Sequence, residues 1–186
     1  RGEGGQGWAE AMPGVATRAG VARRREVVGS SVEITDFGMA VADNVEARGR
    51  GIGQEDARDM LAGAEMGLAK PMLDRLLLDE GRIFGMAVSL REVAVLPDPV
   101  GRVIEERSRP SGLKLTKVAS PIGVIVIIYE SRPNVTADAA GLCFKSGNAT
   151  ILRGGKEAIH SNKIIAKIMV EAAAGALPAF PADAIQ

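Results

Sequence analysis

The stretch Ile122-Gly123-Val124-Ile125-Val126-Ile127-Ile128-Tyr129 decides the fold. It is a short, continuous, β-branched apolar run, which is typical of a strand buried on both faces of a parallel sheet. A second apolar run, Ala149-Thr150-Ile151-Leu152, follows it, and a third opens at Ala184-Ile185-Gln186. These segments predict an α/β fold whose strands are separated by helices.

Two helical patterns lie between the predicted strands. The first has a cap at Asn134 or Thr136 and ends at Gly147, and the second is stopped by Gly175 and Pro178. The predicted inward faces are Val135, Ala139, Leu142 and Cys143 in the first helix, and Ile164, Ile165, Ile168, Met169 and Ala172 in the second. Right-handed crossovers then place the strands parallel in one open sheet.

Open parallel sheets bind ligands just outside the carboxyl ends of their strands. In this sequence those ends are residues 130–134 and residues 153–157, which are polar, charged and interrupted by glycine or proline. The topology therefore predicts that the two segments form one ligand crevice.

The second segment, Arg153-Gly154-Gly155-Lys156, has the features of an anion site. Two glycines allow a close backbone approach, and a following helix with adjacent cations favours a nucleotide phosphate or ribose. The alternative is a glycine-rich turn whose cations are merely solvated. The three-glycine dinucleotide fingerprint is missing.

The first segment offers Arg132, whose planar fork suits a carboxylate or a phosphate, next to Pro133, which stiffens the backbone. Asn134 serves either a ligand or the helix as its cap, and the two roles are compatible.

Residues 1–96 are predicted to be a helical region with interruptions. Glycines near the start and at 49, 51 and 53 are expected to break helices. Two apolar stripes have helical spacing, namely Met60, Leu61, Ala64 and Leu68, and then Ile83, Ala87, Leu90 and Ala94. Pro97 and Pro99 close this region.

Residues 97–119 predict a β-hairpin arm with its turn at residues 109–112. A hairpin this polar is not stable alone, so we expect it to pack on another domain or subunit. The alternative is a surface excursion without a partner. Residues 120–186 form the third zone, the α/β part.

Composition excludes several classes of protein. Lys+Arg and Asp+Glu are balanced at 23 each, so no global field attracts nucleic acid or an anionic membrane. No apolar run is long enough to span a bilayer. One cysteine and one histidine make neither a disulfide framework nor a protein-only zinc site, and they suit a reducing compartment. Arg23-Arg24-Arg25 is interpreted as a solvated helix face rather than a targeting arm.

Cys143 is not expected to be a nucleophile, because it shares an apolar helix face and has no histidine nearby in sequence to lower its pKa. His160, near the start of the last helix, is expected at the surface or at a cap rather than as a base.

At this point the sequence resembles a known family. Residues 120–135, the segment "KSGNATILRGGKEAIHSN" (145–162), "MLDRLLL" (72–78) and "LPDPVGRVIE" (96–105) resemble γ-glutamyl phosphate reductases of the aldehyde dehydrogenase superfamily. The match runs from about residue 71 to the end, and a weaker one reaches back to "VADNVEAR" near residue 40. Residues 1–30 do not resemble the family, and the glycines at 49, 51 and 53 depart from its unbroken helix.

The resemblance implies an aldehyde-dehydrogenase-like NADP-binding domain, three-layered (αβα) with a parallel sheet and incomplete in this chain, a hairpin that makes homo-oligomers, and a catalytic domain absent from this chain. It implies the NADPH-dependent reduction of L-glutamyl 5-phosphate to L-glutamate 5-semialdehyde in proline biosynthesis, in the cytoplasm. In that reaction a cysteine thiolate from beyond residue 186 displaces phosphate to give a thioester, which then accepts hydride. No metal is expected, and glutamate 5-kinase is a possible partner.

The resemblance also implies roles for residues. Tyr129, Glu130 and Ser131 correspond to the nicotinamide side of the crevice, and Arg132 or Asn134 to the position that stabilises the oxyanion or substrate phosphate. Arg153, with Gly154, Gly155 and Lys156, corresponds to the ribose contact and would suit the 2′-phosphate of NADP. The alternatives are a nucleotide-binding or oligomerising module without chemistry, and the reductase half of a bifunctional pyrroline-5-carboxylate synthase.

Overall fold

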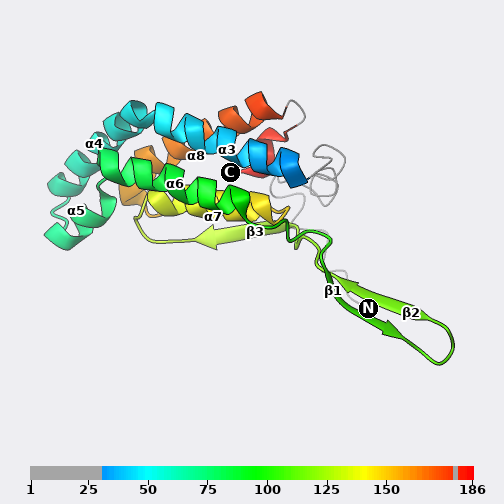
Figure 1. Ribbon diagram of the computed structural model, residues 1–186. Coiled ribbons are helices and arrows are strands. Elements are labelled where there is room, and N and C mark those ends of the chain that lie inside the picture. Colours follow the sequence, from blue (N-terminus) through cyan, green and yellow to red (C-terminus); the bar gives the residue numbers. More distant parts are fainter. Residues whose placement is uncertain (1–30, 178–179) are drawn as a thin grey trace.

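The computed structural model describes residues 31–177 and 180–186. The predictions for the glycine-rich start, for Arg23-Arg24-Arg25 and for Pro178 fall outside these residues. The described elements are, in chain order, α3 (Ser31–Ala47), α4 (Gly49–Glu65), α5 (Lys70–Leu76), α6 (Glu80–Val95), β1 (Val103–Ser108), β2 (Lys114–Val118), β3 (Val124–Ile128), α7 (Asn134–Lys145), β4 (Ala149–Arg153), the 3₁₀ turn η1 (Lys156–Ala158), α8 (Ile159–Ala176) and the 3₁₀ turn η2 (Ala182–Ala184). Figure 1 shows the helices gathered above β3, with the β1–β2 hairpin projecting away from them.

The parallel sheet that the sequence predicts is present. β3 pairs with β4 in parallel, with Val124 opposite Ala149 and Ile128 opposite Arg153. Ile185 adds a parallel bridge to Thr150, so the third strand segment is placed beside β4. The predicted β-α-β-α-β order is therefore confirmed.

The prediction that the first strand is buried on both faces is wrong for this chain. Val126 is 60% exposed and Ile128 is 80% exposed. Their β-branched side chains suit a covered sheet face, but the described helices lie on the other side of β3 (Figure 1). β4 is better covered, because Ala149 and Thr150 are buried.

Helix α7 ends as predicted but does not begin as predicted. Its N-cap is Pro133, which provides no side-chain cap, and Asn134 is already the first helical residue. Gly147 has φ +76°, and its N–H bonds to the carbonyl of Phe144, which closes the helix. Leu142, predicted to face inward, is 51% exposed, whereas Ala139 and Cys143 are buried.

Helix α4 corrects two predictions. Within residues 31–65 the helix is interrupted only at Arg48, between α3 and α4. Gly51 and Gly53 lie inside the continuous helix α4. The predicted stripe does not face inward, since Leu61 is 66% exposed. The buried positions of α4 are Ile52, Asp56, Asp59 and Gly63.

Two buried carboxylates explain why this face of α4 is polar. Asp59 accepts hydrogen bonds from the backbone N–H groups of His160 (3.1 Å) and Ser161 (2.8 Å) in the first turn of α8. Asp56 accepts one from the backbone N–H of Leu78 (2.9 Å). A helix start has backbone donors without intrahelical partners, so α4 must present acceptors here instead of aliphatic side chains.

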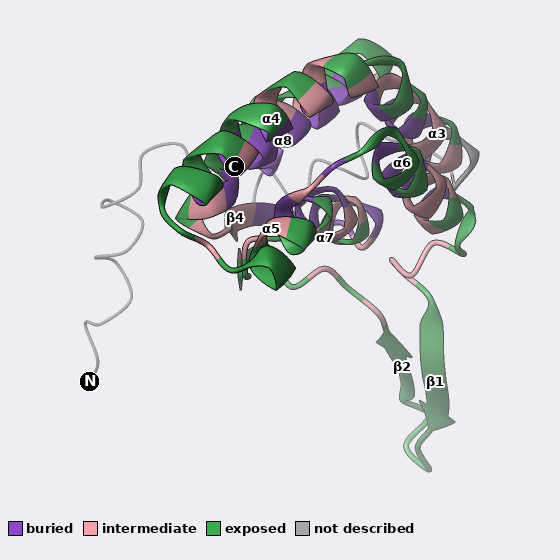
Figure 2. Ribbon diagram, turned by 90° about the vertical axis from the view of Figure 1, so that its left-hand side faces the viewer, coloured by how far each residue is buried: buried purple, intermediate pink, exposed green. Residues whose placement is uncertain are grey.

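The N-terminal helices share one core with the α/β part. The second predicted stripe is confirmed, because all four of its residues are buried in α6. In α8, Ile165, Ile168, Met169 and Ala172 are buried as predicted, while Ile164 is only partly covered. Figure 2 shows the buried faces of these helices turned toward one another.

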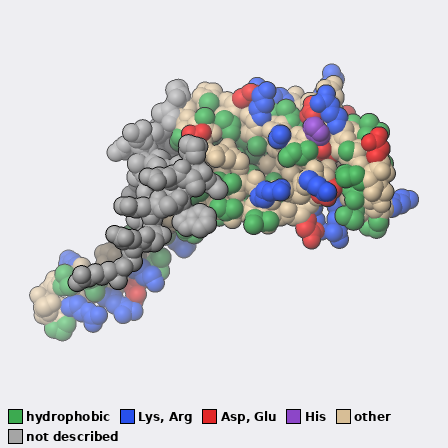
Figure 3. All heavy atoms as spheres, turned by 180° about the vertical axis from the view of Figure 1, so that it is seen from behind, with side chains coloured by type: hydrophobic (Ala, Val, Ile, Leu, Met, Phe, Trp, Pro, Cys, Tyr) green, Lys and Arg blue, Asp and Glu red, His purple; other side chains and the backbone are tan. Residues whose placement is uncertain are grey.

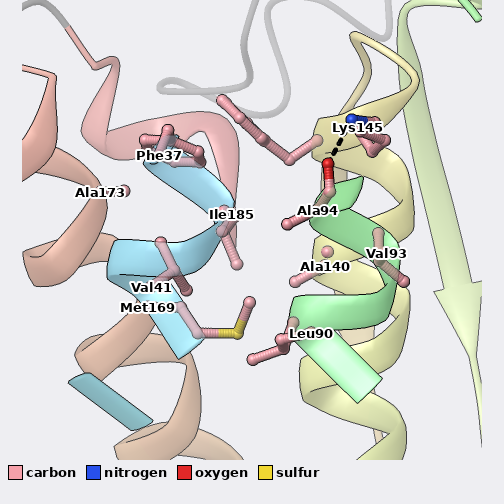
Figure 4. A pocket seen from close by; sticks show the side chains of 13 residues that line it. Phe37, Val41, Leu90, Val93, Ala94, Ala140, Lys145, Met169, Ala173 and Ile185 are labelled. Carbon is pink, nitrogen blue, oxygen red and sulfur yellow. Dashed lines mark hydrogen bonds between the residues drawn. The ribbon is translucent and has the colours of Figure 1, made fainter. Parts of the chain in front are cut away.

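A small apolar cavity of about 30 Å³ lies in the core between α3, α6, α7 and α8 (Figure 4). At its edge the buried ammonium of Lys145 donates to the carbonyl of Ala94 at 2.6 Å. Phe37, Phe144 and Phe180 pack around each other nearby. The cavity is lined by the core itself and is too small for an organic ligand.

The predicted hairpin is confirmed. β1 and β2 are antiparallel, with Arg107 opposite Leu115, and Gly112 in the turn has φ +83°. Both strands are exposed along their whole length (Figure 2).

Candidate functional site

The two segments predicted to form a crevice meet at the carboxyl ends of β3 and β4. The backbone N–H of Tyr129 donates to the carbonyl of Arg153 at 3.1 Å. The hydroxyl of Ser131 donates to a carboxylate oxygen of Glu157 at 2.6 Å. This bond lowers the pKa of Glu157, because it stabilises the ionised carboxylate. Residues 130–134 and 153–157 therefore lie next to each other, as the parallel topology requires.

The glycines of this locality are required by packing inside the protein. A Cβ atom at Gly154 would lie 2.3 Å from the side-chain nitrogen of Asn162 and 3.0 Å from the ring of Tyr129. At Gly155 it would lie 2.0 Å from the Ser131 hydroxyl oxygen. The glycines let the two loops close on one another, whereas the sequence pattern predicts that they make room for a ligand.

Arg153 and Lys156 flank these glycines as exposed cations. One guanidinium nitrogen of Arg153 donates to the carbonyl of Gly154 at 2.7 Å. Neither side chain forms a salt bridge with the residues that the structure describes, so both charges are available to an anion in solvent.

Tyr129 is held in place by a short chain of hydrogen bonds. Its hydroxyl lies 2.7 Å from that of Thr136, which in turn donates to the side-chain oxygen of Asn162 at 2.9 Å. Burial raises the pKa of Tyr129, with the bond to Thr136 opposing. Sequence reasoning missed Thr136 and Asn162, whose only signal is that they are polar residues on otherwise apolar helix faces.

Arg132 and Asn134 lie on the other side of this segment. They line a groove of about 430 Å³ between the start of α7 and helices α5 and α6. Both are exposed. Arg153 and Lys156 are not among the residues that line this groove, so the predicted oxyanion or phosphate residues do not share it with the two cations.

The opposite wall of the groove was not predicted as part of a site. It includes Arg75 and Arg82, and Asp138 contributes from α7. A guanidinium nitrogen of Arg75 lies 3.5 Å from a carboxylate oxygen of Glu130, which links α5 to residues 130–134. Arg75 is inside the family-like stretch 72–78, but no local pattern there indicates a ligand contact.

The remaining candidates are Cys143 and His160. Cys143 is buried, and burial raises the pKa of its thiol. The side chain of His160 is 48% exposed. Figure 3 shows the chain's one histidine at the surface, on a face where acidic and basic side chains are interspersed. No helix within residues 31–177 and 180–186 is long and apolar enough to cross a membrane.

Comparisons with known proteins identify relatives of this chain. No protein-family model matches the chain. It is 53% identical to the γ-glutamyl phosphate reductase of Moorella thermoacetica over 148 residues, which make up 80% of this chain and 35% of that protein. It is 55% identical to the enzyme of Syntrophomonas wolfei, over 73% of this chain and 32% of that protein. The chain is a homologue of the γ-glutamyl phosphate reductases.

Solved structures agree with this relationship. The γ-glutamyl phosphate reductase of Thermotoga maritima has a TM-score of 0.79 and 34% identity, covering 90% of this chain and 41% of that one. The Saccharomyces cerevisiae γ-glutamyl phosphate reductase has a TM-score of 0.82 and 33% identity, covering 91% and 43%. A probable aldehyde dehydrogenase of Listeria monocytogenes, 15% identical with a TM-score of 0.54, shows the shared fold, over 90% of this chain and 35% of that one. The family resemblance and the aldehyde-dehydrogenase-like fold are confirmed.

The chain spans about a third of the length of the curated γ-glutamyl phosphate reductases that it matches.

Proposed function

We propose that this chain forms the cofactor-binding and substrate-binding part of a cytoplasmic γ-glutamyl phosphate reductase of proline biosynthesis. The reaction would be the NADPH-dependent reduction of L-glutamyl 5-phosphate to L-glutamate 5-semialdehyde, with release of phosphate. The nucleophilic cysteine would come from residues other than these, because the thiol of Cys143 is buried on α7.

The observation that carries this proposal is the pair of exposed cations at the carboxyl end of β4, neither of which forms a salt bridge with a described residue. Arg153 and Lys156 are the side chains that would hold the 2′-phosphate of NADPH, and residues 129–131 would lie along its nicotinamide side. The residues present fit such a group, because an exposed guanidinium and an exposed ammonium are the donors that a phosphate monoester requires. When bound, the cofactor supplies hydride.

Arg132 and Asn134 would hold the phosphorylated end of the substrate. The guanidinium of Arg132 is exposed at the groove mouth and can bind two phosphate oxygens at once. Asn134, in the first turn of α7, adds an amide donor beside the positive end of the helix dipole.

The hairpin supports a role in assembly. Its exposed apolar side chains are Val103, Ile104, Leu113, Leu115 and Val118. We propose that β1 and β2 pack against another copy of the protein, because a two-stranded hairpin is marginal when both faces are in water.

Calorimetric titration with NADPH tests the cofactor assignment. We expect Arg153→Ala to weaken NADPH binding about tenfold or more, since it removes a charged hydrogen bond, and to affect NADH much less. Arg50→Ala, an exposed arginine on α4, is the matched control and should change neither affinity. NADPH binding that is tight and equal in the wild-type and Arg153→Ala proteins would contradict the assignment.

A further inference from the structure

The groove beside Arg132 combines charged side chains with the apolar residues Leu77, Leu78 and Met86, and it has room for a small amino-acid derivative. Its volume is about 430 Å³. One wall comes from α5 and α6 and the other from the first two turns of α7. The charged side chains that line it differ sharply in how many hydrogen bonds and salt bridges they already form within the protein.

The guanidinium of Arg82 is already bonded to groups of the groove wall. It donates to the carbonyl of Leu77 at 2.9 Å and pairs with the carboxylate of Asp74 at 2.9 Å. A further bond reaches the carbonyl of Asp74. These carbonyls lie at the carboxyl-terminal end of α5, where they have no intrahelical donor, so Arg82 closes that helix end.

Arg75 and Arg132 form far fewer side-chain contacts than Arg82. Arg75 has one contact of 3.5 Å to Glu130, and the side chains are 52% and 76% exposed. Such an exposed pair contributes little and exchanges readily for a better anion. Arg132 forms no side-chain hydrogen bond or salt bridge with the residues that the structure describes.

Asp138 is the complementary group. It lies about one helical turn after Asn134, half-buried on the groove wall. Burial raises the pKa of its carboxyl group, and the side chain of Asn134 opposes this by donating a hydrogen bond. No cation among the described residues pairs with it, so a ligand ammonium would improve its surroundings.

We propose that this groove recognises the amino-acid end of the substrate, with Arg75 on the α-carboxylate and Asp138 on the α-ammonium. This rests on the proposed function, in which Arg132 holds the phosphorylated end. The two charges are of the sign and kind that an α-amino acid presents, and they line the same groove as Arg132. The groove then selects an aminoacyl phosphate over a simple acyl phosphate.

A stable phosphonate of matching length tests the proposal by calorimetry on the full 186-residue chain. The probe is L-2-amino-6-phosphonohexanoate. Its comparators are 6-phosphonohexanoate, which lacks the ammonium, and 5-aminopentylphosphonate, which lacks the carboxylate. We expect the complete probe to bind about tenfold more tightly than either comparator, because each lost group removes one charged hydrogen bond.

The variants assign each preference to a residue. Asp138→Asn should abolish the preference over 6-phosphonohexanoate and retain the other, and Arg75→Gln should do the reverse. Arg82→Gln is the structural contrast, because it should lower the melting temperature and weaken all three ligands equally. Measuring the preferences instead of single affinities keeps the result independent of small changes in folding.

Two outcomes overturn the inference. One is a wild-type protein that binds the three phosphonates equally, and the other is a pair of variants that keep both preferences. Titration of the same preparations with NADPH separates this from the proposed function. NADPH binding that depends on Arg153, combined with no preference among the phosphonates, removes the groove assignment and leaves the cofactor assignment standing. If the wild-type protein also fails to bind NADPH, the groove assignment and the cofactor assignment are both wrong.

Discussion

A Cβ atom at Gly155 would lie 2.0 Å from the Ser131 hydroxyl oxygen and 2.8 Å from a carboxylate oxygen of Glu157. The backbone at this position has φ −61° and ψ 148°, which any residue adopts, so the requirement for glycine is one of space. A side chain here would displace Ser131 and break its contact with Glu157, the hydrogen bond that joins the two loops.

We therefore expect Gly155→Ala to reduce the free energy of unfolding by about 1–3 kcal/mol, the usual effect of forcing an extra methyl group into a closed site. Urea denaturation measures this. Gly53→Ala is the control, because it is in helix α4 with nothing within 4 Å of the added atom. It should stabilise by roughly 0.5–1 kcal/mol. An unchanged midpoint for Gly155→Ala would show that the loops have room to adjust.

Cys143 illustrates a residue whose surroundings decide its chemistry. It is 5% exposed, and burial raises the pKa of its thiol, while a hydrogen bond with Thr150 opposes this. A protonated, covered thiol is a poor nucleophile.

The thiol should thus resist modification in the folded protein. With a disulfide reagent at neutral pH, we expect reaction at least about a hundredfold slower than in denaturant, because thiolate fraction and access both fall on folding. Chromophore release measures the rate. Reaction at the same rate in both states would mean that Cys143 is exposed and reactive.

At the scale of elements, sequence patterns predicted what depends on neighbours along the chain. The crossover order predicted the paired strands and placed residues 130–134 and 153–157 together, because parallel strands share one carboxyl edge. The turn chemistry at Gly112 and Gly147 was equally local.

What depends on distant partners was missed. The inward face of α4 is set by backbone donors far away in the sequence, at the start of α8 for Asp59 and at Leu78 for Asp56, so both carboxylates are inside and Leu61 is outside. The groove residues Arg75 and Asp138 are far apart in sequence, and the side-chain cap expected at Asn134 does not form.

Asp56 gives this element-level packing a pH dependence. Burial is the largest cause of its raised pKa, and hydrogen bonds from Leu78 and Ser161 oppose it. Because the folded-state pKa lies above the unfolded value, the folded protein binds more protons in the interval between them. The contribution of Asp56 to stability is thus full below the unfolded pKa and is lost as pH rises through the folded pKa.

Asp56→Asn removes this titration and keeps one acceptor oxygen. We expect the wild-type protein to gain stability relative to the variant, by up to about 1 kcal/mol, when pH falls from about 7 to about 4. Urea unfolding of both proteins at the two pH values measures the gap. A gap that stays constant, or widens in favour of the variant at low pH, would contradict the raised pKa.

At the scale of the whole molecule, two apolar surfaces stay uncovered among the described residues. One is the outer face of β3, where Val126 is 60% exposed and Ile128 is 80% exposed, together with Ile122 just before the strand. The other is the hairpin, which projects from the helices (Figure 1). Contiguous apolar surface of this kind marks a place where another part or another copy packs. The two surfaces should bind different things. The hairpin has free strand edges on which a second copy can pack, whereas the β3 face is one side of a sheet that another part of the protein would cover.

Leu115→Glu separates the two surfaces. The new carboxylate would stand opposite Arg107 on β1, so the hairpin should keep its register while losing an apolar contact. If the hairpin mediates self-association, sedimentation velocity should show a concentration-dependent oligomer for the wild-type protein. The variant's dissociation constant should be about tenfold larger or more, the cost of one leucine contact. Ile128→Thr on β3 is the control, since it should reduce the binding of an apolar dye without changing the sedimentation. If Leu115→Glu sediments like the wild type and Ile128→Thr is the variant that dissociates, then self-association uses the open sheet face and the hairpin has another role.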